Sequence, residues 1–234
     1  MIEFGHGTHV GLRRTRNEDT YYADPGLGLF LVADGMGGHQ HGEIAAALVR
    51  DAIVEQAARG ISLVEAVRGA GERLLARGGN TPEELPMGTT VAALHLAGEE
   101  YEVVWVGDSR VYLWQQGVLR QVSHDHSLVQ ALVAAGKLDP AMAHRHPQRN
   151  VLTQALGVTA VDQLHIGMAR GRTRPGSAFV LCSDGLTESL TDAAIAQIAG
   201  RSDLAAQECV DHLLLAALAG SADDNITAIL ARVS

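Results

Sequence analysis

In the segment LFLVADGMGG, residues 29–38, an apolar run is followed by an aspartate, and three of the next four residues are glycines. An Asp-Gly pair after a buried strand can be a simple turn, because glycine adopts backbone angles that other residues avoid and aspartate hydrogen-bonds to its own turn. The segment FVLCSDGL, residues 179–186, closes a second apolar run with the same pair. The repetition favours a shared role for Asp34 and Asp184 over two unrelated turns.

Acidic residues also flank other strand-like runs. They are Asp108 after YEVVWVG (101–107), Asp223-Asp224-Asn225 before ITAILARV (226–233), and Asn17-Glu18-Asp19 before a run that starts at residue 20. Hard divalent cations such as Mg²⁺ and Mn²⁺ prefer carboxylate, carbonyl and water oxygens as ligands. The sequence therefore predicts an oxygen-ligated cation site where several strands end.

The chain has 234 residues and a formal net charge of −9. A chain of this length buries on the order of 70% of its unfolded surface, so it needs neither disulfides nor a structural metal to fold. We expect one domain over residues 1–234. The negative charge argues against a nucleic-acid partner, which would require an excess of Lys and Arg.

Two features predict a soluble, cytoplasmic protein without membrane contact. Cys182 and Cys209 lie in apolar patterns without metal-ligand spacing, which indicates buried, reduced thiols. The N-terminal residues contain no apolar core of signal-peptide length, and the later apolar stretches are too short to span a bilayer.

Hydrophobic periodicity divides the chain into strands and helices. The predicted strands are 20–24, 29–34, 89–96, 101–107, 110–115, 118–122, 163–168, 178–183 and 226–232. The predicted helices are 42–59, 63–77, 127–135, 192–198 and 204–219, with Thr191-Asp192 and Ser202-Asp203 as N-caps. Hairpin-length turns and paired helices favour an α+β fold with stacked antiparallel sheets and outer helices. The polar segment 136–150 is predicted to be a functional loop.

Six motifs follow one another along the chain. They are GLRRTRNED (11–19), DGMGG (34–38), GTT (88–90), GDSR (107–110), SDG (183–185) and DN (224–225). Each is weak alone, but the ordered set resembles the type-2C, metal-dependent serine/threonine protein phosphatases, the PPM family, and its bacterial members in particular. The resemblance covers essentially the whole chain. It implies a four-layer αββα sandwich of two antiparallel sheets flanked by helices, with a dinuclear metal site at one end.

The resemblance also implies a ligand set for two core Mn²⁺ or Mg²⁺ ions. Asp34 would bridge both ions, and Gly35 would offer its backbone carbonyl to one of them. Asp184 and Asp224 would complete the other. Two such cations about 4 Å apart share a water, lower its pKa and aim it at phosphorus, so that no protein nucleophile is needed.

Four further residues receive roles from the same resemblance. Glu18 and Asp19 match an acidic pair that holds a metal or its waters, and Asp108 matches, with Asp184, a third metal site. Arg14 is predicted to bind the phosphoryl oxygens, because a guanidinium pairs bidentately with phosphate. The alternative for Arg14 is a solvated surface charge.

The chain departs from many eukaryotic members at Met36, where they have a histidine that is a candidate general acid. His39 or a metal-bound water could serve instead, and the sequence does not choose between them; exposed surface positions are the other interpretation of His39 and His41. Residues near 124–150 match the family's flap. The histidines of this region, His124, His126, His144 and His146, are predicted to be solvated or to contact substrate rather than to bind zinc.

The leading hypothesis is a metal-dependent phosphatase that removes phosphate from phosphoserine and phosphothreonine in proteins. The expected partners are phosphoproteins, namely a cognate Ser/Thr kinase and its targets, and the expected state is a monomer. One alternative is a pseudophosphatase that binds phosphoproteins without turnover, against which the intact set Asp34, Asp184 and Asp224 argues. The other is a phosphatase of one small phosphoprotein in a partner-switching stress pathway.

Overall fold

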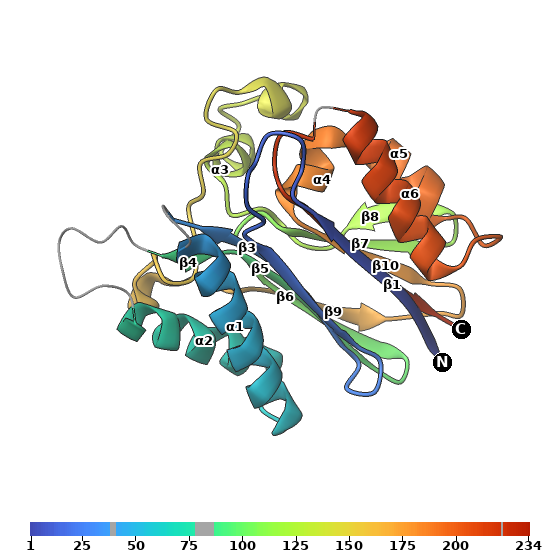
Figure 1. Cartoon of the computed structure of the whole chain (residues 1–234), viewed down its shortest axis with the longest axis horizontal. Coiled ribbons are helices and arrows are strands. Elements are labelled where there is room, and N and C mark those ends of the chain that lie inside the picture. The colour runs from blue at the N-terminus through green and yellow to red at the C-terminus, as the bar shows by residue number, and fades with distance from the viewer. Residues whose placement is uncertain (38–40, 78–86, 221) are drawn as a thin grey trace.

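Two antiparallel sheets stack face to face and carry helices on their outer faces (Figure 1). The computed structural model describes residues 1–37, 41–77, 87–220 and 222–234. One sheet has the strand order β1-β11-β10-β7-β8 and the other the order β2-β3-β5-β6-β9, with the short β4 paired to β3. The predicted αββα sandwich is confirmed.

The strands of the first sheet are β1 (Ile2–His9), β7 (Arg110–Gln115), β8 (Val118–Gln121), β10 (Ala178–Cys182) and β11 (Ile226–Val233). Those of the second are β2 (Asp19–Asp24), β3 (Leu29–Met36), β4 (Gly88–Thr89), β5 (Val91–Ala97), β6 (Glu100–Val106) and β9 (Gly167–Arg172). The helices are α1 (His41–Ala58), α2 (Leu63–Arg77), α3 (Leu128–Ala134), α4 (Asp184–Ser189), α5 (Asp192–Ala199) and α6 (Ala206–Ala219), with 3-10 turns η1 (Pro140–Arg145) and η2 (Val161–Gln163).

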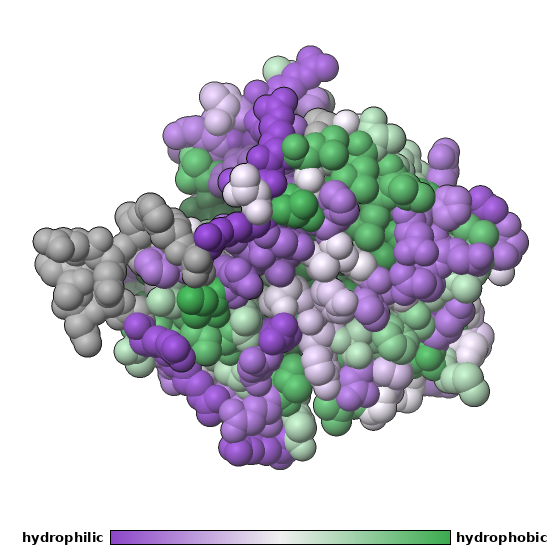
Figure 2. All heavy atoms as spheres, in the orientation of Figure 1, coloured by the Kyte–Doolittle hydropathy of each residue, from purple (hydrophilic) through white to green (hydrophobic). Residues whose placement is uncertain are grey.

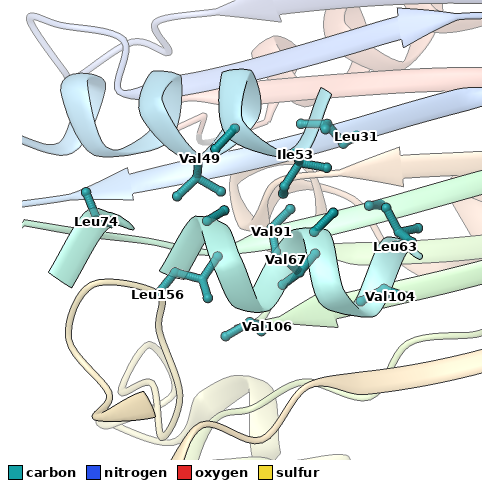
Figure 3. Close-up of a cluster of buried hydrophobic side chains, with 14 of the residues drawn as sticks. Leu31, Val49, Ile53, Leu63, Val67, Leu74, Val91, Val104, Val106 and Leu156 are labelled. Carbon is teal, nitrogen blue, oxygen red and sulfur yellow. The ribbon is translucent and has the colours of Figure 1, made fainter. Parts of the chain in front are cut away.

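Residues 29–33 of strand β3 are apolar without interruption because both faces of the strand are buried there. Leu29 and Leu31 pack under α1 and α2 in the cluster of Figure 3, while Phe30 and Val32 point into the layer between the sheets. Successive side chains of a strand alternate between faces, so a strand covered on both sides needs apolar residues throughout. Strand β10 follows the same rule, with Phe179 in the layer between the sheets.

Strand β1 was not predicted, and its glycines explain why. A Cβ atom on Gly5 would lie 2.4 Å from the Cα atom of Gln207 in α6, and one on Gly7 would lie 2.5 Å from the Leu214 side chain. Helix α6 therefore packs directly on the backbone of β1. The close approach requires glycine, which removes the alternation of large side chains that identifies a strand.

Two sequence predictions are wrong. A strand was expected at 163–168, but this stretch contains the end of η2 and a loop, and β9 begins only at Gly167. Leu164 and Ile166 are apolar because they pack in the cluster beneath α2. Ser202-Asp203 does not cap α6, which begins at Ala206, and Asp203 pairs with Arg201 instead. By contrast, the Thr191 hydroxyl accepts a hydrogen bond from the Ala194 N–H and caps α5 as predicted.

The predicted loop 136–150 contains η1 and, together with α3, projects beyond the sheets (Figure 1). Its side chains are mostly exposed, and Figure 2 shows hydrophilic residues gathered over this part of the molecule. Among the helices of the described residues, none combines the length and hydropathy of a transmembrane span.

Candidate metal centre

The predicted carboxylates come together where the two sheets meet. Asp34 near the end of β3 lies directly opposite Asp19 at the start of β2, so both side chains extend from the same face of their sheet. From the other sheet, Asp184 begins α4 immediately after β10, and Asp224 lies just before β11. Asp108 lies between β6 and β7.

Burial and mutual repulsion disfavour the charged forms of these carboxylates. Burial raises the pKa of Asp34 well above its usual range, and four neighbouring carboxylates raise it further: Asp19, Asp184, Asp108 and Asp224. Burial likewise raises the pKa of Asp184, that of Asp108 to about 7 and that of Asp19 to about 6. Like charges directly opposite on paired strands are destabilising. A bound cation would remove this repulsion.

Two of these carboxylates retain oxygens that suit a hard cation. Oδ1 of Asp19 and Oδ1 of Asp184 are buried without a hydrogen-bond partner. Buried polar atoms are normally paired, and each unpaired one calls for an explanation such as an ion. Within the described residues, however, no three His, Cys, Asp or Glu side chains already converge as a finished cation site. The donor set, hard carboxylate oxygens, fits a divalent ion.

Arg14 lies at this centre and contacts one of the predicted ligands. Its guanidinium donates a hydrogen bond of 2.6 Å to Oδ2 of Asp224, and its side chain is 56% exposed. The bond to Asp224 raises the pKa of Arg14, and the charges of Asp184 and Asp34 contribute. Arg14 therefore carries a fixed positive charge at the edge of the carboxylates, where it can reach both Asp224 and a bound anion.

Gly35 and Glu18 lie against the first turn of α1. A Cβ atom on Gly35 would be 2.0 Å from the Gly42 carbonyl oxygen, and one on Gly42 would be 2.8 Å from Cδ of Glu18. The glycines thus allow the helix start to approach the strand end closely. Burial raises the pKa of Glu18, which also feels the charge of Asp224. Glu18 and Gly35 therefore lie at the centre, beside the start of α1.

Buried hydroxyls hold the backbone around Asp34. The Thr90 Oγ1 accepts from the Asp34 N–H at 3.0 Å and is hydrogen-bonded to Oγ of Ser109 at 2.7 Å. The Thr89 hydroxyl donates to the Asp34 carbonyl oxygen at 2.8 Å. The GTT motif therefore fastens the end of β3, and the Thr90–Ser109 bond links the motif to the residue that follows Asp108.

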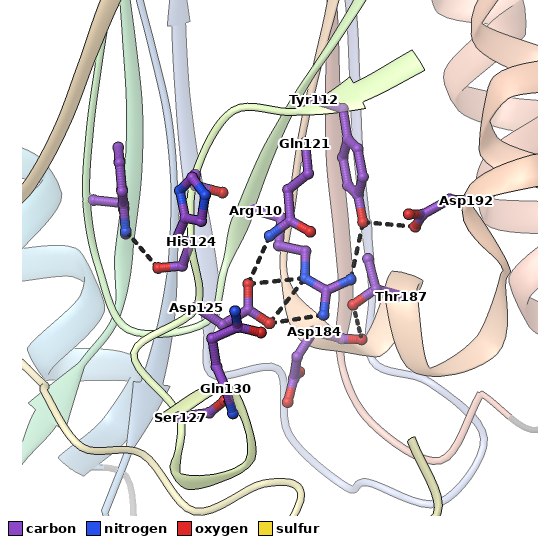
Figure 4. A network of polar contacts seen from close by, with 12 residues as sticks. Arg110, Tyr112, Gln121, His124, Asp125, Ser127, Gln130, Asp184, Thr187 and Asp192 are labelled. Atoms are coloured by element: carbon purple, nitrogen blue, oxygen red, sulfur yellow. Dashed lines mark hydrogen bonds and ion pairs between the residues drawn. The ribbon is translucent and has the colours of Figure 1, made fainter. Parts of the chain in front are cut away.

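A polar network links β7, the start of the predicted flap and α5 (Figure 4). Arg110 donates to both oxygens of Asp125, at 3.0 Å and 2.7 Å, and to the Tyr112 hydroxyl, which in turn donates to Asp192. After burial, the charge of Asp125 is the largest cause of the raised pKa of Asp108. By pairing with Asp125, Arg110 limits that repulsion.

Sequence reasoning missed Glu188 and gave no role to Asn225 of the DN motif. Glu188 follows Asp184 by one helical turn in α4 and raises the pKa of both Asp184 and Asp108. Two acidic residues at this spacing repel each other on a helix, but the spacing is informative only where a helix is predicted, and α4 was not. Asn225 accepts from the Glu18 N–H and donates to the Val10 and Arg16 carbonyls, so it fastens the loop that carries Arg14.

The histidines near Met36 and in the flap were the candidates for proton transfer or substrate contact. His39 lies outside the described residues. His41 begins α1, and its Nδ1 is buried without a hydrogen-bond partner. Met36 ends β3 and pairs with Gly88. Of the flap histidines, His126 accepts a hydrogen bond at Nδ1 from the Gly107 N–H, which joins the start of the flap to the residue before Asp108.

Comparison with known proteins assigns the chain to a family. A family model described as protein phosphatase 2C matches residues 7–219. The serine/threonine protein phosphatase PstP of Mycobacterium tuberculosis is 37% identical over 239 residues, an alignment that covers 100% of this chain and 45% of PstP. The chain therefore spans about half the length of that relative. The serine/threonine phosphatase Stp of Listeria innocua is 30% identical, with 95% and 94% covered.

Solved structures agree with the sequence relatives. The crystal structure of PstP from M. tuberculosis superposes with a TM-score of 0.90 at 33% identity and covers 100% of this chain and 99% of that one. A structure of the PstP catalytic domain in complex with two manganese ions has a TM-score of 0.87 at 32% identity, with 99% and 97% covered.

Proposed function

The chain belongs to the protein phosphatase 2C family, and we propose that it is a protein phosphatase that hydrolyses phosphoserine and phosphothreonine with the help of Mn²⁺ or Mg²⁺. The observation that carries this proposal is the buried carboxylate Asp34, surrounded by four others and bordered by Arg14. Such a cluster suits cations, and the neighbouring guanidinium suits a phosphoryl group.

Each residue has a defined task in this proposal. Two core ions would be held by Asp34, the Gly35 carbonyl, Asp184 and Asp224, with Glu18 and Asp19 supporting them and Asp108 contributing to a third. When bound, the ions would polarise the phosphoryl oxygens and acidify a water.

Arg14 would hold the phosphoryl oxygens and orient the phosphorus toward the carboxylates. Asn225, which fastens the loop of Arg14 to β11, would keep the guanidinium in place. Arg14 keeps its positive charge beside Asp224. It can therefore bind the phosphoryl group throughout the reaction without gaining or losing a proton.

The proposed setting follows from the same reasoning. The substrates would be phosphoproteins, among them a cognate Ser/Thr kinase and its targets, and residues 1–234 would form one catalytic domain that acts as a monomer, with a flap near 124–150. We place the protein in the cytoplasm, where the buried thiols of Cys182 and Cys209 would stay reduced.

The activity can be tested directly. Purified protein supplied with Mn²⁺ should hydrolyse p-nitrophenyl phosphate and release phosphate from phosphoserine and phosphothreonine peptides. Binding of these peptides without any turnover would contradict the proposal and favour a pseudophosphatase. Turnover of a single phosphoprotein, with a panel of phosphopeptides left intact, would favour the partner-switching alternative.

Replacing Arg14 by alanine tests the predicted phosphate-binding residue. A charge-assisted hydrogen bond contributes roughly 1.5–3 kcal/mol, so Arg14→Ala should lower kcat/KM about 10- to 150-fold and raise KM. Affinity for Mn²⁺ should not fall, because the variant frees Asp224 from a competing cation. Steady-state kinetics and calorimetric Mn²⁺ titration measure the two effects. Weakened Mn²⁺ binding with unchanged kcat/KM would assign Arg14 to the metal centre instead.

A further inference from the structure

Two buried hydroxyls converge on one oxygen of Asp19. Ser183 donates to Oδ2 at 2.7 Å and Thr227 donates to the same atom at 2.6 Å. Ser183 and Thr227 are fully buried, and Asp19 is 9% exposed. The other oxygen, Oδ1, is buried and has no hydrogen-bond partner. One oxygen of this carboxylate therefore accepts two hydrogen bonds, whereas the other accepts none.

The donors themselves are held in place by further hydrogen bonds. The Thr227 N–H donates to Oγ of Ser183 at 2.9 Å, which fixes the acceptor side of that hydroxyl. Thr227 Oγ1 is 2.8 Å from Oγ1 of Thr8, and because Thr227 gives its own proton to Asp19, Thr8 must be the donor between them.

Asn17 closes this chain into a ring. Its Nδ2 donates to Oγ1 of Thr8 at 2.8 Å, and its Oδ1 accepts from the Asp19 N–H at 3.2 Å. Each bond has a defined direction, so the ring runs from the Asp19 N–H through Asn17, Thr8 and Thr227 back to Oδ2 of Asp19. The carboxylate is thus fixed at its backbone and at Oδ2, which leaves Oδ1 as its free acceptor.

We propose that Ser183 and Thr227 are positioning residues that orient Asp19 so that Oδ1 alone is offered to the cation centre. Asp34 lies directly across the β2–β3 pair from Asp19, so the two side chains share one face of the sheet. A carboxylate that rotated freely could turn both oxygens toward the cations or toward other donors. This inference rests on the proposed function, because it requires a cation at the centre.

A structural role is the competing explanation. Asp19 belongs to one sheet, whereas Thr227 lies in β11 of the other and Ser183 directly follows β10, so their hydrogen bonds also join the sheets. A purely structural role predicts that loss of a hydroxyl lowers the melting temperature of the metal-free protein and leaves cation affinity unchanged. A positioning role predicts a loss of cation affinity that the conservative hydroxyl variant restores.

The test compares three variants by calorimetric Mn²⁺ titration of chelator-treated protein. Thr227→Val removes the hydroxyl that donates to Asp19 and keeps the side-chain shape, whereas Thr227→Ser keeps that donor. Thr8→Val is the matched control, because it removes a hydroxyl that bonds to Thr227 and not to Asp19. Loss of a partner that orients a metal ligand typically costs about 10- to 100-fold in affinity. We expect this loss for Thr227→Val, near-normal affinity for Thr227→Ser, and a much smaller loss for Thr8→Val.

The outcomes separate the alternatives. Unchanged Mn²⁺ affinity in Thr227→Val, failure of Thr227→Ser to restore it, or an equal loss in Thr8→Val would overturn the inference. If Thr227→Val does not fold, the same loss is expected for Ser183→Ala, and its normal affinity would overturn the inference equally. Absence of Mn²⁺ binding by the wild-type protein would instead overturn the proposed function on which it rests.

Discussion

Excess EDTA is expected to abolish phosphatase activity, and addition of Mn²⁺ or Mg²⁺ is expected to restore it. The centre consists of carboxylates bordered by the Arg14 guanidinium, and water becomes an effective nucleophile at neutral pH when a cation lowers its pKa. The measurement is release of p-nitrophenol before chelation, in EDTA, and after the cation is returned in excess. Full activity in EDTA would overturn the proposed chemistry.

The same experiment has a second readout in thermal stability. A ligand that binds only the folded protein stabilises it by about 2.7 kcal/mol at 100 times its Kd. Because Asp34 and its neighbours repel one another without a cation, Mn²⁺ should raise the melting temperature of the chelated protein. NaCl at equal ionic strength is the control, since screening of surface charges alone should produce a much smaller shift.

The strands that carry the centre could be predicted because they are buried on both faces. Residues 29–33 of β3 and all residues of β10 are apolar; the first run stops at Asp34, and Asp184 lies two residues beyond the end of the second. A carboxylate at the end of an apolar run can be recognised from the sequence alone. Helix α4 was not predicted, because its six residues are too few to show a helical period.

The contacts between distant segments could not be predicted. Arg14 and Asp224 are 210 residues apart in the chain, and Ser183 and Asp19 are 164 apart. No local pattern says that these pairs meet, because the meeting depends on how the two sheets stack. Motif spacing could suggest which residues belong to one site, but not which oxygen of Asp19 would remain free.

Asp34→Asn is expected to reduce activity far more than Asp108→Asn. Asp34 is predicted to bridge both core ions, whereas Asp108 is predicted to contribute only to an accessory one. Loss of an outer partner of a metal site typically costs roughly 10- to 100-fold in activity or metal affinity. Asp34→Asn should therefore lower kcat/KM by more than this range, and Asp108→Asn by about this range or less. The measurement is kcat/KM at saturating Mn²⁺. Asp51→Asn, which changes a side chain 68% exposed on α1, is the control and should match the wild type.

Stability should change in the opposite direction from activity. Burial and repulsion raise the pKa of Asp34, so its charged form destabilises the folded state at any pH above the folded-state pKa. Asparagine has nearly the same shape and no charge. In EDTA at alkaline pH, Asp34→Asn should therefore melt at a higher temperature than the wild type, while its stabilisation by Mn²⁺ is lost. A lower melting temperature together with a normal Mn²⁺ shift would show that Asp34 serves the fold rather than the cations.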